Sequence, residues 1–193
     1  MTDELRSFAA LARRRRSSLR VDPELPIDTV LLEQLLTVAA TAPNHRRTTP
    51  WRFRVITGDG RRGLGEALAG ELLADPAFDP VADAPKLVKA RSKYLRAPVM
   101  VVVGSRAGTD EVATLENRDA VAAAVQTLLL AATAAGLGSL WSTGAAADST
   151  HVARFCRLDP TDAVVGLVYL GWPTAELDDV ERPAPEIEYI EQA

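Results

Sequence analysis

The chain has 193 residues, 47% hydrophobic and 25% charged, which is an ordinary composition for a soluble globular protein. Its length suits one domain with a substantial core, so we expect a single domain over residues 1–193. The formal net charge of −4 gives no reason to expect binding to nucleic acid, which depends on net or clustered positive charge.

The first third of the chain predicts two helices and one strand. Apolar residues recur at helical spacing in residues 1–16 and again after Asp28, whose carboxylate can cap a helix. The second helix should end before Pro43, because the residue before a proline disfavours the helical conformation. Residues 51–56 alternate apolar side chains with arginine, which is typical of a strand with one exposed face.

The rest of the chain predicts further helices and three strands. Residues 98–104 and 163–171 are apolar runs typical of strands covered on both faces. Ser149 can cap a short helix that reaches Phe155. The other expected elements are helices over 62–73, 86–94 and 115–135, a short strand over 139–142 and an acidic, proline-rich tail over 172–193. The class is therefore α+β or mixed α/β.

Two segments invite interpretations that the residues around them disfavour. Residues 120–141 carry no charge and are long enough to cross a bilayer. They are rich in alanine, however, and contain Gln126. We therefore expect a helix buried in a core or subunit interface and no membrane contact. Residues 58–63 match G-x-G-x-x-G, but the position of the required ribose-binding acid falls in a loop, so a surface turn is expected.

Three other segments could hold a ligand. The arginine run 13–16, followed by Ser17, is either the solvated end of a helix or a phosphate clamp, and its residues alone leave both open. The loop 42–51 connects a helix to a strand, where ligand contacts are common. The small residues in 136–144 would let a planar ligand approach the backbone.

Candidate acids, bases and nucleophiles are scarce. Cys156 is the only cysteine, so it forms no internal disulfide or zinc site; we expect a packed, inert thiol and a reducing cytoplasm. His151 has no partner motif and is expected to be exposed. The sequence shows no Ser-His-Asp set, metal-ligand spacing or Walker loop, so the reactive chemistry should belong to a cofactor.

These segments, in this order, resemble the nitroreductase family along nearly the whole chain. The resemblance rests on five motifs in register: Arg15–Arg16–Ser17, AATAPN at 39–44, PWRFRV at 50–55, the apolar helix ending AGLG at 135–138 before Trp141, and VGLVYLGWP at 165–173. The short length and Asn44–His45 are similar to the small bacterial subgroup of NAD(P)H nitroreductases.

The resemblance implies a fold, a cofactor and a set of cofactor-binding residues. The fold is a central mixed or antiparallel sheet flanked by helices, with a long buried helix at the interface of a homodimer that holds two FMN molecules. The implied FMN-binding residues are Arg15, Arg16, Ser17, His45, Trp141, Ser142, Thr143 and Arg182. The arginines and Ser17 would hold the phosphate and ribityl chain, and His45 would reach the flavin of the neighbouring subunit. No catalytic side chain and no metal are implied.

The chain departs from the family pattern at three positions. Thr49 stands where a glutamine usually precedes Pro-Trp, Arg47 where many relatives carry asparagine, and Thr41 where the small subgroup can carry a basic residue. Positions 47 and 49 often contact the flavin ring in the family, so its hydrogen bonding is expected to differ here.

The activity that the resemblance implies is ping-pong hydride transfer. NAD(P)H would reduce FMN, and an electron-poor acceptor such as a nitroaromatic or a quinone would then take the hydride. Three alternatives stay open: a flavin-binding or flavin-sequestering protein with little turnover, a flavin enzyme of another reaction type such as a dehalogenase, and an interaction protein without flavin. The sequence names neither the acceptor nor the preferred nicotinamide nucleotide.

Overall fold

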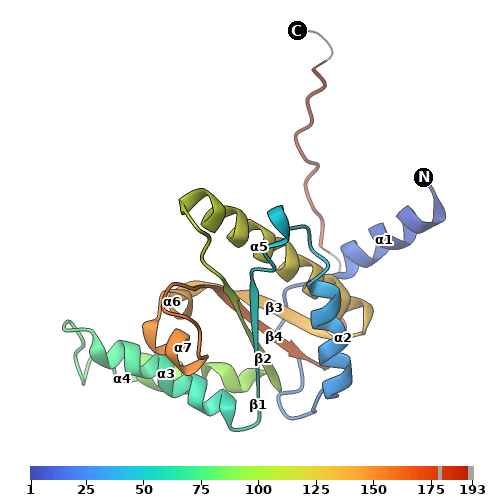
Figure 1. The fold of residues 1–193 in the computed structure, drawn as a ribbon. Coiled ribbons are helices and arrows are strands. Elements are labelled where there is room, and N and C mark those ends of the chain that lie inside the picture. The colour runs from blue at the N-terminus through green and yellow to red at the C-terminus, as the bar shows by residue number, and fades with distance from the viewer. Residues whose placement is uncertain (178–179, 191–193) are drawn as a thin grey trace.

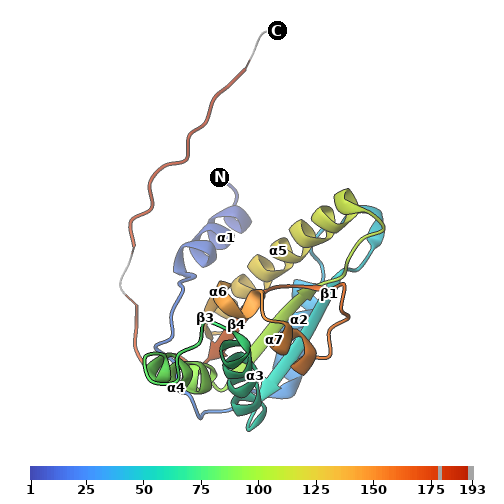
Figure 2. The same ribbon diagram turned by 90° about the vertical axis from the view of Figure 1, so that its left-hand side faces the viewer.

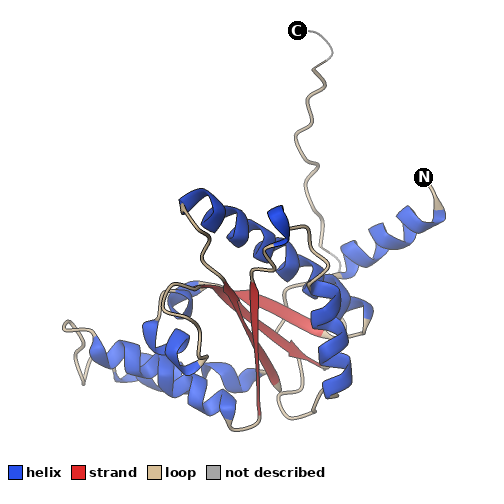
Figure 3. Cartoon of the chain, in the orientation of Figure 1, coloured by secondary structure: helices blue, strands red, loops and turns tan. Residues whose placement is uncertain are grey.

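The computed structural model describes residues 1–177 and 180–190. A four-stranded sheet of order β1-β2-β4-β3 crosses the molecule, with helices on both of its faces (Figures 1 and 3). Its strands are β1 (Trp51–Thr57), β2 (Val99–Ser105), β3 (Gly138–Ser142) and β4 (Ala163–Gly171), and the neighbouring strands are antiparallel. The predicted α+β fold, with a central antiparallel sheet flanked by helices, is confirmed.

The two inner strands separate two hydrophobic cores. Every residue of β2 is buried, as its continuous run of apolar residues predicts for a strand covered on both faces. Because side chains alternate along a strand, Val101 and Val103 enter one core and Met100 and Val102 the other. The sheet is thus the middle of three layers.

Helices of different lengths cover the two faces. The long helix α5 (Glu111–Ala134) and α2 (Thr29–Ala39) pack on one face. The other face is covered by α3 (Gly60–Ala74), α4 (Ala84–Ser92), α6 (Gly144–Ala147) and α7 (Thr150–Phe155), which Figure 2 shows in front of the sheet or beside it. Two 3-10 helices, η1 (His45–Arg47) and η2 (Lys93–Arg96), complete the described elements.

Both unusual segments of the sequence adopt the expected conformations. Residues 58–63 form a turn and the start of α3, and β1 pairs with β2 antiparallel, which excludes a Rossmann unit here. The uncharged run lies mostly in α5, where residues such as Val121, Val125 and Leu128 are fully buried in the core. Within residues 1–177 and 180–190, no helix has the length and apolarity that crossing a bilayer requires.

The two chain ends project from this body. The first helix, α1 (Asp3–Arg14), contains no buried residue, and its apolar Leu5 and Phe8 are 52% and 55% exposed. Residues 180–190 are extended and exposed, and Figure 1 shows them leaving the body beside α1. Residues 178–179 and 191–193 of the expected domain and tail lie outside the described residues.

Candidate functional site

The connection after α1 runs beside the edge strand β3. Ser17 forms a parallel bridge with Ser139 of β3, and the Ser18 amide donates a hydrogen bond to the Ser139 carbonyl at 2.9 Å. The backbone of β3 uses its other edge to pair with β4. Ser17, the last of the expected phosphate-binding residues, is therefore fixed to the open edge of β3 by backbone contacts, and Arg15 and Arg16 directly precede it.

Arg182 joins this connection from the far end of the sequence. Its guanidinium donates to the Arg15 carbonyl at 3.0 Å and to the Ala12 carbonyl at 3.3 Å, at the end of α1. Burial lowers the pKa of Arg15, and the nearby charges of Arg182 and Arg16 lower it further. Three guanidinium groups are thus held close together despite their mutual repulsion, an arrangement that an anion would stabilise.

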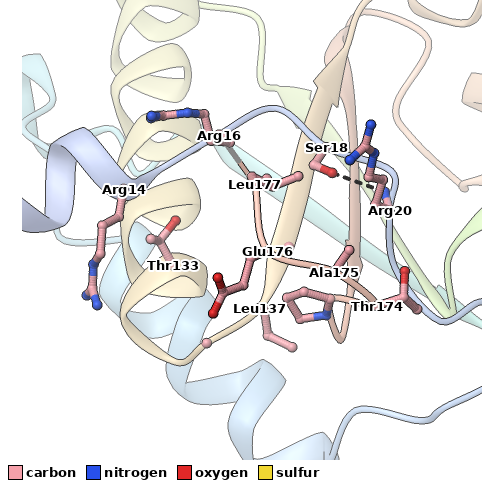
Figure 4. Close-up of a pocket in the computed structure, with 13 residues that line it drawn as sticks. Arg14, Arg16, Ser18, Arg20, Thr133, Leu137, Thr174, Ala175, Glu176 and Leu177 are labelled. Atoms are coloured by element: carbon pink, nitrogen blue, oxygen red, sulfur yellow. Dashed lines mark hydrogen bonds between the residues drawn. The ribbon is translucent and has the colours of Figure 1, made fainter. Parts of the chain in front are cut away.

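Arg16 lies between two open hollows. Its guanidinium donates to the Arg15 carbonyl at 3.3 Å and also bonds the Arg13 carbonyl. The larger hollow, of about 750 Å³, is bordered by the connection after α1, the end of α5 and the chain after β4 (Figure 4). Among the described residues, the charged ones that line it are Arg14, Arg16, Arg20 and Glu176, so cations outnumber anions within this set. The second hollow, of about 520 Å³, adds Ser17 and Arg96.

The expected flavin-lining residues follow Ser139 along the same strand. Trp141 and Ser142 are half-buried at the end of β3, and Thr143 is exposed just after it. The indole of Trp141 lies against Gly166 of β4, where an added Cβ would come within 2.2 Å of its Nε1. Among the described residues, this buried Nε1 has no hydrogen-bond partner. These three residues line neither hollow beside Arg16.

The structure places His45 at the opposite end of α5. His45 is exposed in η1, and its loop borders the start of α5, whereas the hollow beside Arg16 borders Thr133 and the end of α5. The rise of a helix puts Asn117 and Thr133 about 24 Å apart. One copy of the chain therefore does not bring His45 to the arginines, although it does bring together Arg15, Arg16, Ser17 and Arg182.

A buried asparagine fixes the His45 loop, and the sequence reasoning missed it. Asn117 is 3% exposed; it accepts a hydrogen bond from the Thr48 hydroxyl at 2.6 Å and donates one to the Arg106 carbonyl at 3.0 Å. The available signal was the position of Asn117 four residues before Val121, on the face of α5 that Val121 and Val125 bury, because a polar amide needs partners when it is buried.

Two expectations about reactive side chains have different outcomes. Cys156 is buried, as predicted, and burial raises the pKa of its thiol to about 11. The prediction that His151 is simply exposed was wrong: the residue is half-buried, and its Nδ1 lies 3.0 Å from Oε2 of Glu71. Helix α3 supplies this carboxylate, and no local pattern around His151 indicates it.

The fold and the arginine-lined edge of β3 together define a nitroreductase-like protein. The model of the nitroreductase family matches residues 12–172, and the chain belongs to this family. YdjA of Escherichia coli K12, named among the NAD(P)H nitroreductases, is 30% identical over 180 residues, which cover 91% of this chain and 95% of YdjA.

Solved structures agree with this assignment of the fold. A nitroreductase-like family protein from Bacillus cereus has a TM-score of 0.83 at 25% identity, over 96% of each chain. A nitroreductase with bound FMN from Bacteroides fragilis has a TM-score of 0.73 at 23% identity, over 99% of this chain and 100% of that one. At 23% identity, the likeness to the Bacteroides fragilis protein establishes the fold alone.

Proposed function

We propose that the protein is an FMN-dependent oxidoreductase that transfers hydride from NAD(P)H to an electron-poor acceptor such as a nitroaromatic or a quinone. The observation that carries the proposal is the fixing of Ser17 and Ser18 beside Ser139 of β3, directly after Arg15 and Arg16 and two residues away from Trp141. Membership of the nitroreductase family and the name of YdjA support the same class of reaction.

The described residues fit FMN in two respects. The cluster of Arg15, Arg16 and Arg182 offers guanidinium groups to a phosphate dianion. The charge of the phosphate would offset the two effects that lower the pKa of Arg15, burial first and the neighbouring arginines second. Trp141 and Ser142, which follow Ser139 along β3 and are half-buried, leave part of their surface open at the strand end where the flavin is expected. When bound, FMN would supply the hydride chemistry.

The side chains of this chain would bind and orient rather than react. Arg15, Arg16 and Ser17 would hold the phosphate and ribityl chain, with Arg182 behind them. Trp141 would support the ring, because the absence of a side chain at Gly166 lets its indole pack against β4. Cys156 takes no part, since its thiol is buried and has a raised pKa.

The position of His45 supports the proposal of a homodimer. Since His45 and the arginines lie at opposite ends of α5, a flavin that contacts both would need a second copy of the chain. The exposed apolar side chains of α1, Leu5 and Phe8, are available for such an interface. A reducing cytoplasm suits the single buried thiol.

The test is an absorbance spectrum of freshly purified protein, followed by addition of NADPH without oxygen. Flavin bands near one per subunit that bleach with NADPH are the expected result. Protein that stays colourless after incubation with FMN would overturn the proposal. Bound flavin that stays oxidised would instead favour a flavin-sequestering protein, an alternative that Arg47 and Thr49 support because both depart from the family pattern in the His45 loop.

A further inference from the structure

The loop after α2 has an unusual backbone. Arg46 and Arg47 both have a φ of 54°, and Thr49 has a φ of 46°. Residues other than glycine are disfavoured in this left-handed region, because their Cβ approaches the following carbonyl oxygen. Three such residues within four positions persist only where surrounding contacts hold them in place.

Those contacts are present at both ends of the loop. The Thr49 amide donates to Oδ1 of Asn44 at 3.1 Å. The Thr48 hydroxyl donates to the buried amide of Asn117, whose other side is bonded to the Arg106 carbonyl. The loop is therefore held against α5 and the chain after β2. Its exposed side chains project from a backbone that these contacts hold in place.

The side chains that the loop displays are cationic. Arg46 and Arg47 are both exposed, and within the described part of the chain neither forms an ion pair with a carboxylate. Arg46 and His45, together with Arg106, line a hollow of about 390 Å³. Two acids also line this hollow: Asp110 accepts the Ala113 amide as the cap of α5, and Glu116 lies one residue before Asn117 on the same helix. Arg46 donates from Nε to Nε2 of His45 at 3.2 Å, and Arg47 is exposed beside it, outside the hollow. Neither guanidinium group has a carboxylate partner among the described residues.

We infer that Arg46 and Arg47 form a binding site for the 2′-phosphate of NADPH. The inference rests on the proposed function, because it takes this loop, which carries His45, to lie beside the partner's flavin, where the adenosine end of NADPH would extend beyond the ring. The 2′-phosphate is what distinguishes NADPH from NADH, and guanidinium forks match phosphate oxygens in geometry and charge. A carboxylate on an aromatic acceptor carries a single charge and is the weaker match for two arginines.

The test compares binding of NADP⁺ and NAD⁺ to the flavin-loaded, full-length protein by titration calorimetry, which needs no turnover. The variants are Arg46→Asn, Arg47→Asn and both together, because asparagine accepts the left-handed backbone and the loop can keep its shape. Arg62→Asn is the matched control, since it removes an exposed arginine from α3 on the other side of the sheet.

Wild-type protein should bind NADP⁺ more tightly than NAD⁺. The double variant should lose about ten-fold or more in NADP⁺ affinity, the range for hydrogen bonds to charged groups, and keep its NAD⁺ affinity.

Equal affinities of the wild-type protein for the two nucleotides, or equal losses of both in the double variant, would overturn the inference. So would an unchanged preference accompanied by a raised KM for 4-nitrobenzoate, because the arginines would then bind the acceptor. The flavin spectrum of the same samples separates this result from failure of the proposed function. Colourless protein contradicts the proposed function, whereas flavin-loaded protein without a preference for NADP⁺ contradicts the inference alone.

Discussion

Glu71 Oε2 lies 3.0 Å from His151 Nδ1 and joins α3 to the first turn of α7. The same oxygen accepts hydrogen bonds from the Ser149 hydroxyl at 2.8 Å and from the His151 amide at 3.1 Å. Ser149 in turn accepts the Val152 amide as the N-cap of α7. One carboxylate on α3 thus completes the cap of a short helix that is distant in the sequence.

This arrangement predicts an acid-sensitive contribution to stability. The hydrogen bond from Ser149, followed by those from the His151 amide and ring, lowers the pKa of Glu71 from 4.5 to about 2. Because the folded-state pKa is the lower one, the stabilisation is fully present above pH 4.5 and is lost as the pH falls towards 2. Replacing Glu71 by glutamine should lower the free energy of unfolding by about 1 kcal/mol at pH 7.

Urea denaturation of the wild-type protein and Glu71→Gln at pH 7, 5 and 3 measures this contribution. The difference between the two proteins should shrink at pH 3. Glu66→Gln is the control, since Glu66 forms an exposed ion pair with Arg91 and its loss should have little effect at any pH. A difference that stays constant from pH 7 to pH 3 would contradict the role given to the Glu71 carboxylate.

Asn117 is expected to control the order of the His45 loop. Asn117→Ala leaves the Thr48 hydroxyl and the Arg106 carbonyl without their partner, in a site that is almost closed to water. The free energy of unfolding should fall by about 1–3 kcal/mol, the penalty for an unsatisfied buried polar group. Hydrogen exchange should accelerate in residues 44–49 in particular. Thr48→Val, which removes one of the two contacts, should give a smaller change; an equal or larger one would argue against Asn117 as the common anchor.

Local sequence patterns predicted most of the elements, because their causes are local. The valine run of β2, the Asp28 cap of α2 and the Ser149 cap of α7 all form as expected. Long-range contacts carry no such signal. Thr48 and Asn117 are 69 residues apart, and Glu71 and His151 are 80 apart. The sequence did not predict helix α6, because its four small residues have no side-chain cap and carry no local pattern.

The candidate site was predictable only through the family resemblance. Arg15–Arg16–Ser17 permitted two interpretations from its residues alone, and its position beside Ser139 depends on a backbone bridge between distant segments. Arg182 had no local reason to lie near Arg15, yet its guanidinium reaches the Arg15 carbonyl. His45 could not be placed by the sequence or by one copy of the chain, because the contact expected of it is with a second copy.

Gly166 should be intolerant of a side chain because of the indole beside it. A Cβ at this position would lie 2.2 Å from Nε1 of Trp141 and 3.0 Å from the Ser142 carbonyl. Gly166→Ala is therefore expected to displace Trp141 and to lower the free energy of unfolding by about 1–3 kcal/mol, as overpacking of a core does. It should also weaken FMN binding, since the end of β3 would move.

The double variant Gly166→Ala/Trp141→Phe tests the cause. Phenylalanine lacks the indole nitrogen that the new methyl group would meet, so part of the lost stability should return. Thermal unfolding of the two variants and of Trp141→Phe alone gives the coupling between the positions. Additive effects would show that the strain at Gly166 arises elsewhere in β4.

Arg16 is expected to control retention of FMN rather than the rate of its chemistry. It adjoins Arg15 and Arg182, and the Arg15 carbonyl accepts hydrogen bonds from both Arg16 and Arg182, so a phosphate bound there would gain charge-assisted hydrogen bonds. Arg16→Ala should weaken FMN binding by about ten-fold or more. The affinity of the wild-type protein should fall as salt screens the exposed part of the cluster. Arg182→Ala should have a smaller effect, because this side chain holds the end of α1 through the Arg15 and Ala12 carbonyls.

Equilibrium dialysis gives the FMN affinities, and anaerobic mixing with NADPH gives the reduction rate of the flavin that remains bound. Arg6→Ala is the matched control, since it removes an arginine from the first turn of α1, where Arg6 pairs with Asp3. The expected pattern is a loss of bound FMN in Arg16→Ala with little change in the reduction rate per flavin. A full complement of FMN with lost turnover would place Arg16 at the reacting ring instead of the phosphate, and the orientation proposed for FMN along β3 would have to be reversed.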